Sequence, residues 1–146
     1  IRYRPNYDPA AVQYMREELI HVGFKELLTS DQVGESLLQN NDESVFLVVN
    51  SVCGCAAGSA RPGIALALQH HLIPEHPFCT FAGMDKKPLE YIRQRFLSNY
   101  VPSSPCFTLF RNGEIEFIME RKDLVNKSPE EIAEITTKNA EEMFGI

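Results

Sequence analysis

Two hydrophobic patterns divide the chain into predicted helices and strands. Apolar residues at helical spacing follow three N-cap signals, which are Asp8-Pro9, Thr29-x-x-Gln32 and Ser128-Pro129. In each signal a side-chain oxygen can accept a backbone N–H of the first helical turn, and two of them place proline at the first helical position. The pattern therefore predicts helices over about residues 9–22, 30–38 and 129–143.

Short apolar runs predict four strands, at residues 45–50, 78–83, 107–110 and 115–119. The first run has no polar alternation, so we expect it to be covered on both faces. Asn112-Gly113 is a two-residue hairpin signal between the last two strands. Two further helices lie between the first three strands, one after Cys55 that contains Pro62 and one capped by Asp85. A strand, helix, strand order predicts a right-handed parallel crossover.

This order of elements predicts an α/β fold of the thioredoxin-like type. We expect a central four-stranded mixed sheet flanked by helices, with an N-terminal helical extension, in a single domain that spans residues 1–146. Thioredoxin-like folds place a cis-proline before the third of these strands, facing the chemistry-bearing turn. Ser104-Pro105 occupies that place and is the predicted cis bond.

Composition restricts the function classes. The 146 residues carry a net charge of −6, which argues against nucleic acid because phosphate binding needs clustered Lys and Arg. No apolar run approaches the length of a membrane span, and the sequence shows no signal-peptide pattern. Four cysteines are too few and too unevenly spaced for a secreted disulfide scaffold. We therefore expect a cytoplasmic protein that contacts neither nucleic acid nor membrane.

The candidate chemistry lies in Cys53-Gly54-Cys55, directly after the first predicted strand. Unpaired N–H groups and the helix dipole stabilise an anion at a helix N-terminus, so a cysteine there gains thiolate character. A disulfide between these two residues closes a tighter ring than Cys-x-x-Cys does, and we expect Gly54 to help because glycine tolerates unusual backbone angles. Strained, exposed disulfides tend to be labile, so the pair is expected to oxidise and be reduced reversibly.

Two residues beside this pair have two interpretations each. Asn50 can position a substrate or cap the following helix. Arg61 can pair with an anionic substrate and support the thiolate, or it is a solvated helix residue with a packed stem.

The other cysteines and the histidines are expected to contribute less. Cys79, on a predicted core strand, is interpreted as buried and inert, whereas Cys106 is either a packing residue or a second redox thiol. His70, His71 and His76 have no usual metal-ligand spacing with the cysteines and are interpreted as surface residues.

The stretch VVNSVCGCAAGSARP at residues 48–62 closely resembles the bacilliredoxins, and FAGMDK (81–86) and PSSP (102–105) resemble further segments of that family. The resemblance implies a thiol–disulfide oxidoreductase that removes bacillithiol, or a similar low-molecular-weight thiol, from S-thiolated client proteins. It implies Cys53 as nucleophile and Cys55 as resolving thiol, with the small thiol as co-substrate and no resident cofactor. Weak disulfide reductase or isomerase activity is also implied.

Two residues depart from what this resemblance implies. Cys106, directly after the expected cis-proline, is not part of the family pattern, and Leu47 stands near the place where ordinary thioredoxins bury an aspartate. Two functions of other classes stay open. One is a soft-metal module that binds Cu(I) or Zn through Cys53 and Cys55, with or without Cys106. The other is a redox-inactive interaction domain on the same fold.

Overall fold

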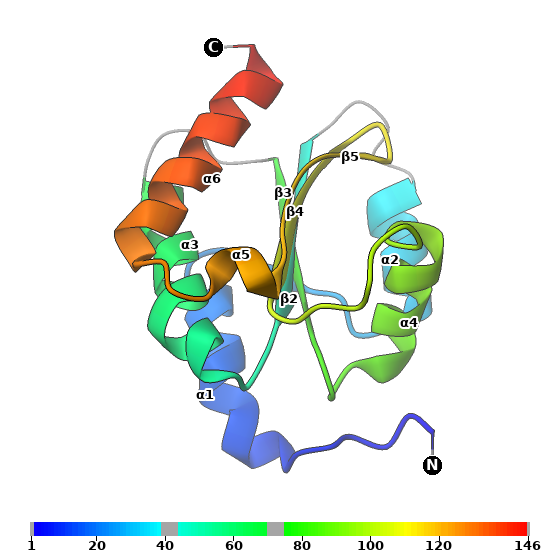
Figure 1. Cartoon of the computed structure of the whole chain (residues 1–146). Helices are drawn as coiled ribbons and strands as arrows, with labels where there is room; N and C mark the ends of the chain where they lie inside the picture. The colour runs from blue at the N-terminus through cyan, green and yellow to red at the C-terminus, as the bar shows by residue number, and fades with distance from the viewer. Residues whose placement is uncertain (1, 39–43, 70–74, 146) are drawn as a thin grey trace.

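The computed structural model describes residues 2–38, 44–69 and 75–145. These residues form one mixed sheet with helices on both of its faces (Figure 1). The strand order is β1-β3-β2-β4-β5. The strands are β1 (Lys25–Glu26), β2 (Ser44–Asn50), β3 (His76–Phe81), β4 (Cys106–Arg111) and β5 (Glu114–Met119).

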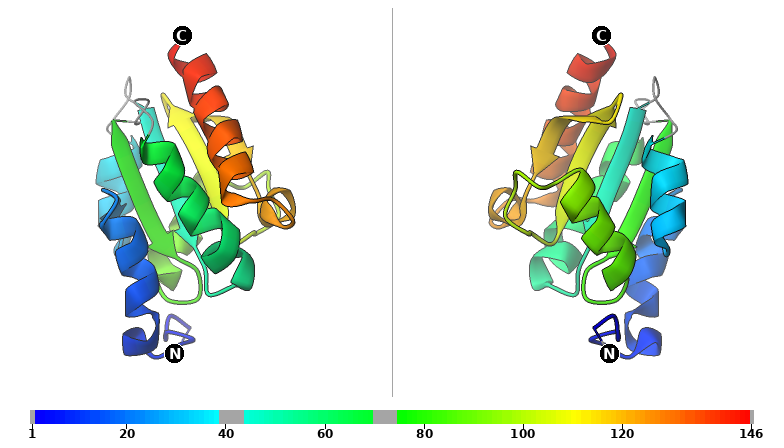
Figure 2. Two further views of the ribbon diagram at one scale, coloured as in Figure 1. Left: turned by 90° about the vertical axis from the view of Figure 1, so that its left-hand side faces the viewer. Right: turned by 90° about the vertical axis from the view of Figure 1, so that its right-hand side faces the viewer.

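The helices form two layers. Helices α1, α3 and α6 cover one face of the sheet, and α2 and α4 cover the other, as the two views in Figure 2 show. None of the helices in the described part of the chain is long and apolar enough to cross a membrane. The helical segments are α1 (Pro9–Ile20), α2 (Ser30–Val33), the π-helical turns η1 (Gly34–Leu38) and η2 (Ala56–Ala60), α3 (Arg61–Gln69), α4 (Lys86–Arg95), α5 (Arg121–Leu124) and α6 (Pro129–Phe144).

Strand β2 is the centre of the molecule, and all of its seven residues are buried. Successive side chains of a strand point to opposite faces. Phe46 and Val48 therefore join the core under α1, α3 and α6, whereas Val45 and Leu47 join the core under α2 and α4. Strand β2 pairs in parallel with β3 and antiparallel with β4. Its carboxyl end thus lies at the same sheet edge as the start of β4 and the end of β5.

The fold class, the mixed sheet and the three helix starts are confirmed. Asp8 accepts the N–H of Ala10 at 3.1 Å, and Thr29 and Ser128 each form a capping box. The predicted number of four strands is wrong, because a fifth strand, β1, pairs in parallel with β3 through two residues. So short a strand leaves no hydrophobic period in the sequence. The polar residues Asn40-Asn41-Asp42, which predict a break after the second helix, lie outside the described residues.

Asp85 has a different role from the predicted helix cap. It occupies the N-cap position of α4, but its carboxylate makes no cap hydrogen bond. It instead accepts two hydrogen bonds from the Arg16 guanidinium, at 2.9 and 2.8 Å, and one from the N–H of Phe81 at 2.9 Å. Arg16 also binds Glu26 at 2.7 Å. The hydrogen bonds to Asp85 are the main reason why the pKa of Arg16 is raised, and they fasten α1 to the sheet.

Candidate active site

The two neighbouring cysteines lie at the turn between β2 and η2. The chain leaves β2 at Asn50, and Gly54 and Cys55 already have helical backbone conformation. The Oγ of Ser51 accepts the N–H of Cys53 at 3.1 Å. The carbonyl of Cys53 accepts the N–H of Ala56 at 2.9 Å. Cys53 is therefore the last residue before the helix, at the position where free N–H groups favour negative charge.

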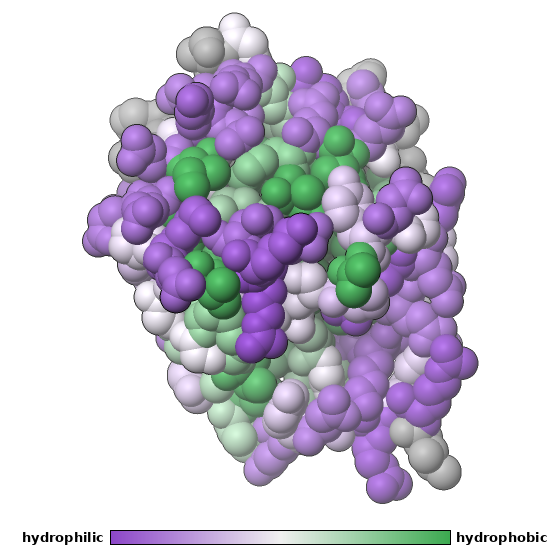
Figure 3. Space-filling view, viewed as in Figure 1, coloured by the Kyte–Doolittle hydropathy of each residue, from purple (hydrophilic) through white to green (hydrophobic). Residues whose placement is uncertain are grey.

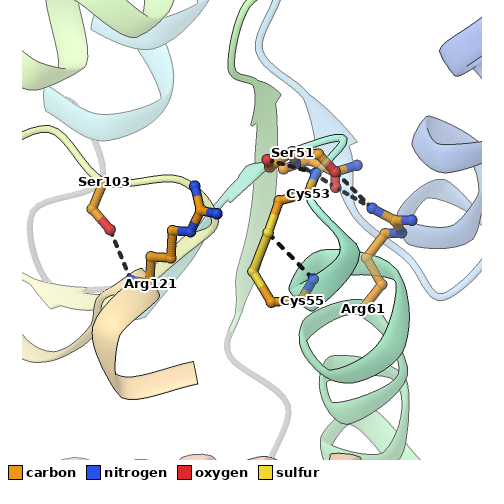
Figure 4. The surroundings of a disulfide bond; sticks show 7 residues. Ser51, Cys53, Cys55, Arg61, Ser103 and Arg121 are labelled. Carbon is orange, nitrogen blue, oxygen red and sulfur yellow. Dashed lines mark hydrogen bonds between the residues drawn. A yellow bond between two sulfur atoms is a disulfide. The ribbon is translucent and has the colours of Figure 1, made fainter. Parts of the chain in front are cut away.

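Cys53 and Cys55 form a disulfide, with a Cα–Cα distance of 5.4 Å (Figure 4). Both residues are half-buried and Gly54 between them is exposed. The N–H of Cys55 donates to the Sγ of Cys53 at 3.2 Å. A donor in this place stabilises a thiolate on Cys53 once the disulfide is reduced, because hydrogen bonding to the charged form of an acid favours that form. The same donor gives no such support to Cys55.

Gly54 does not have the backbone role that the sequence suggested. Its φ angle lies outside the positive region, unlike those of Gly23, Gly83, Gly113 and Gly145. A Cβ atom built on Gly54 would meet no atom within 4 Å. The turn thus has no steric need for glycine. The absence of a side chain at Gly54 leaves the solvent side of the disulfide unobstructed.

Arg61 lies beneath the turn and is only 3% exposed, so the interpretation as a solvated residue is wrong. Its guanidinium donates to the Ser51 carbonyl at 2.9 Å and to the Asn50 Oδ1 at 3.1 Å, and it forms an ion pair with Glu18 of α1. One terminal nitrogen, Nη2, is buried without a hydrogen-bond partner among the described residues. The guanidinium of Arg61 thus binds other residues of the protein and fixes the carboxyl end of β2.

Asn50 has a related structural place, since it joins the same end of β2 to α1. Its Nδ2 donates to the Met15 carbonyl at 3.0 Å, and its Oδ1 accepts the N–H of Ser51 at 2.9 Å. Helix capping, one of its two predicted roles, is therefore wrong. The side chain instead fixes the backbone two residues before Cys53.

The loop before β4 lies at the same edge of the sheet. The Ser104–Pro105 bond is cis, as predicted, with Ser104 half-buried and Pro105 buried. The Oγ of Ser103 accepts the N–H of Arg121 at 2.8 Å, which joins this loop to the start of α5. Figure 4 shows Ser103 and Arg121 on one side of the disulfide and Arg61 on the other.

Comparison with known proteins agrees with this geometry. A family model described as "Disulphide isomerase" matches residues 7–143. A bacilliredoxin of Salinibacter ruber is 41% identical over 127 residues, which cover 87% of this chain and 74% of the relative. The chain belongs to the bacilliredoxin family.

Other members of the family and more distant structures support the same assignment. Bacilliredoxins of Geobacillus kaustophilus and Cytophaga hutchinsonii are 40% and 39% identical to this chain and cover 88% and 87% of it, with 88% and 92% of their own lengths matched. Thioredoxins of Malassezia sympodialis and Fasciola hepatica superpose with TM-scores of 0.56 and 0.52 at 16% and 18% identity. The alignments cover 81% and 80% of this chain and 91% and 99% of those structures. These two likenesses show the thioredoxin fold alone.

The fold, the bacilliredoxin family and the Cys53–Cys55 pair together support a thiol–disulfide oxidoreductase. The remaining thiols have a different environment. Cys79 and Cys106 are both free and buried, and burial raises the pKa of each to about 12. The buried position predicted for Cys79 is confirmed, and the burial of Cys106 favours packing over redox chemistry. Acidic side chains raise the pKa values further, with Glu26 as the largest such contributor for Cys79 and Glu120 for Cys106.

The described residues give the metal alternative no third ligand. No group of three or more His, Cys, Asp or Glu side chains in that part of the chain is placed to hold a metal ion, so Cys106 does not join the pair. His70 and His71 lie outside the described residues. His76 is half-buried at the start of β3 and stacks on Phe78 with 5.9 Å between ring centres, so part of its side chain stays in contact with solvent.

Two residues of this site escaped sequence reasoning. Glu18 is 43 positions from Arg61, and no local pattern connects an acid on one helix with a cation on another. Arg121 follows β5 in a short helix that the hydrophobic pattern did not predict. The hairpin signal at Asn112-Gly113 was the available clue. A hairpin there makes β5 run back antiparallel to β4, so the residues after β5 lie at the edge that carries the cysteines.

Proposed function

We propose that this protein removes bacillithiol, or a similar low-molecular-weight thiol, from mixed disulfides on client proteins, with Cys53 as nucleophile. The observation that carries the proposal is the N–H of Cys55 aimed at the Cys53 Sγ, in a half-exposed pair at the start of a helix. Of the four thiols, Cys53 alone combines access to solvent with a hydrogen bond to its sulfur from the backbone at a helix start.

In the first step the reduced protein reacts with a modified client. The Cys53 thiolate attacks the sulfur of the small thiol, and the client–thiol S–S bond breaks as the new bond forms. The client cysteine leaves as a thiolate and takes a proton from water. The small thiol is then held on Cys53 as a mixed disulfide, and no net oxidation has occurred.

In the second step Cys55 resolves this intermediate. Its thiolate attacks the Cys53 sulfur, the small thiol leaves, and the Cys53–Cys55 disulfide forms. The Cα–Cα distance of 5.4 Å is within the usual range for a bridge. Alternatively a second small thiol attacks the one on Cys53, which yields their symmetrical disulfide and free Cys53. When Cys55 resolves the intermediate, a thiol reductant must supply two electrons to regenerate the reduced Cys53 and Cys55. Through this cycle of oxidation and reduction the protein also acts as a weak disulfide reductase or isomerase.

The residues around the pair have supporting roles in this proposal. Arg61 and Asn50 hold the end of β2, and hence the turn that carries Cys53, against α1. Ser104 and the cis Pro105 lie at the same end of the sheet, directly before the residue that pairs with Val49 of β2, and offer a surface along which a client backbone can lie. The exposed position of Gly54 leaves the approach to the disulfide open.

Two exposed valines give client proteins an apolar surface at this edge. Val101, on the loop before the cis bond, is 81% exposed, and Val125, directly after α5, is 38% exposed. Figure 3 shows hydrophobic groups set among hydrophilic ones on the face that carries α5. Small apolar areas of this kind suit transient contact with many different clients. Two buried free thiols also fit a reducing compartment, and we place the activity in the cytoplasm.

The test is the intact mass of the reduced protein after mixing with a bacillithiol-modified client. Wild type, Cys53→Ala, Cys55→Ala and a control, Cys106→Ala, are compared. We expect a bacillithiol adduct to accumulate on Cys55→Ala and to be absent from Cys53→Ala, while Cys106→Ala behaves as wild type. If no variant removes the thiol from the client, and a glutathione-modified client is also left intact, the proposal is wrong.

A further inference from the structure

An exposed cation faces the disulfide from the side opposite Arg61. Arg121 is the first residue of α5, and its side chain is exposed. In Figure 4 its guanidinium points into the space between the disulfide and the loop that carries Ser103. The backbone N–H of Arg121 is held by the Ser103 Oγ at 2.8 Å, so the base of this side chain is fixed relative to the loop.

The sheet register places Arg121 at this edge independently of its side-chain conformation. Cys106 lies opposite Val49, one residue before the end of β2. The next residue of β4, Phe107, lies opposite Met119, the last residue of β5. Arg121 follows Met119 by two residues, just as the turn that carries Cys53 follows β2. Both segments therefore emerge from the same end of the sheet, on either side of β4.

The charge of Arg121 is available to a ligand. Its guanidinium makes no hydrogen bond or ion pair with any residue in 2–38, 44–69 or 75–145, whereas that of Arg61 is bound to Glu18. The nearest acids in sequence, Glu120 and Asp123, form no ion pair with Arg121 in this part of the chain. Glu120 is half-buried, and the Asp123 carboxylate accepts the N–H of Glu120 at 2.9 Å.

We propose that Arg121 binds a carboxylate of the low-molecular-weight thiol while that thiol is transferred to Cys53, and so makes acidic thiols better substrates than neutral ones. This inference rests on the proposed function and names the class of thiol that the site prefers. A guanidinium recognises a carboxylate through two parallel N–H donors, which adds orientation to the attraction. Arg121 takes no part in the exchange of sulfur bonds; it positions the thiol that is exchanged.

The test uses one peptide that has a single cysteine and no acidic residue. The cysteine carries either 3-mercaptopropionate or 2-mercaptoethanol, which are similar in size and differ in the carboxylate. The second-order rate constant of peptide release is measured at low ionic strength with reduced wild type, Arg121→Gln and Lys122→Gln. Lys122 is the matched control, since it is the adjacent exposed cation on the same helix. For each protein we take the ratio of the rate constant for the 3-mercaptopropionate adduct to that for the 2-mercaptoethanol adduct. Comparing this ratio between proteins cancels the difference in intrinsic reactivity between the two thiols.

We expect Arg121→Gln to lower this ratio by about two- to fivefold, the range for one solvent-exposed ion pair, and Lys122→Gln to keep the wild-type ratio. An unchanged ratio in Arg121→Gln overturns the inference while leaving the proposed function intact, because wild type still reacts. An equal loss in Lys122→Gln overturns it too, since the effect would then be general attraction. No reaction of wild type with either peptide refutes the proposed function instead.

A third peptide distinguishes the source of the carboxylate. It carries the neutral 2-mercaptoethanol adduct and an aspartate next to the modified cysteine. If Arg121→Gln slows only the reaction of this peptide, the carboxylate belongs to the client, and the inference about the small thiol is wrong.

Discussion

Replacing Gly63 with alanine should destabilise the protein, because α3 and α6 are in close contact at this point. A Cβ on Gly63 would lie 2.7 Å from the Ile132 Cγ2, 2.8 Å from the Ile132 Cβ and 3.2 Å from the Pro129 carbonyl oxygen. Ile132 is completely buried and β-branched, so it has little freedom to rotate away. The carbonyl belongs to the backbone of the first turn of α6. The helices must therefore move apart.

The size of the effect follows from two opposing contributions. Overpacking a core by one methyl group costs about 1–3 kcal/mol, and exchanging glycine for alanine inside a helix stabilises by about 0.5–1 kcal/mol. The net expectation for Gly63→Ala is a loss of about 0–2.5 kcal/mol in the free energy of unfolding, with the middle of the range near 1 kcal/mol. Gly58→Ala is the matched control, because a Cβ there meets nothing within 4 Å. It should be neutral or stabilising by up to about 1 kcal/mol.

The assay is urea unfolding of the oxidised proteins, with the midpoint and the slope m fitted separately. A lower midpoint at constant m for Gly63→Ala, with no decrease for Gly58→Ala, is the expected result. If Gly63→Ala is as stable as Gly58→Ala, the close approach of α3 and α6 is not a tight contact in solution and the reasoning is refuted.

Three further predictions concern buried polar groups. The thiols of Cys79 and Cys106 have pKa values raised to about 12 in the folded protein, while unfolded thiols ionise near 8.5. Unfolding therefore releases their protons between these values, and the free energy of unfolding should fall by about 1.4 kcal/mol per pH unit for each thiol as the pH rises through that window. Urea unfolding from pH 8 to 11 checks this, and an equal slope in a variant with valine at both positions would contradict it. Arg61→Met removes the donor to the Ser51 carbonyl, so it should lower the free energy of unfolding by about 2–4 kcal/mol and slow alkylation of reduced Cys53; unchanged stability would argue against this role. Arg16→Met should cost about 3–5 kcal/mol at pH 7, because two largely buried carboxylates lose their cation. Urea unfolding measures this deficit, and a stability equal to that of wild type would count against the charge explanation.

Local signals in the sequence were sufficient for most of the architecture. The unbroken run of β2 identified the central strand, the capping boxes fixed the starts of α2 and α6, and the Asn112-Gly113 turn joined β4 to β5. Each of these signals acts over a few residues, which is the range over which caps, turns and side-chain periods operate. The cysteine pair was found in the same way.

What sequence reasoning missed depends on contacts between distant parts of the chain. Asp85 was interpreted as a cap because its local sequence fits one, yet it binds Arg16, which lies 69 positions away. Arg61 was given a possible place in solvent because the acid that binds it lies on another helix. A competition between a local and a distant partner is decided by the packed geometry, which no short window of sequence contains.

The attachment of α1 to the turn between β2 and η2 has a consequence for anyone who wishes to shorten or fuse this chain. The Met15 carbonyl and the Glu18 carboxylate are joined to the turn through Asn50 and Arg61. A version trimmed to begin at β1 would retain both cysteines, the whole sheet and every strand pairing. It would nevertheless leave a buried guanidinium without its counter-ion directly beneath the reactive pair, so the smallest portable form of this protein begins before α1.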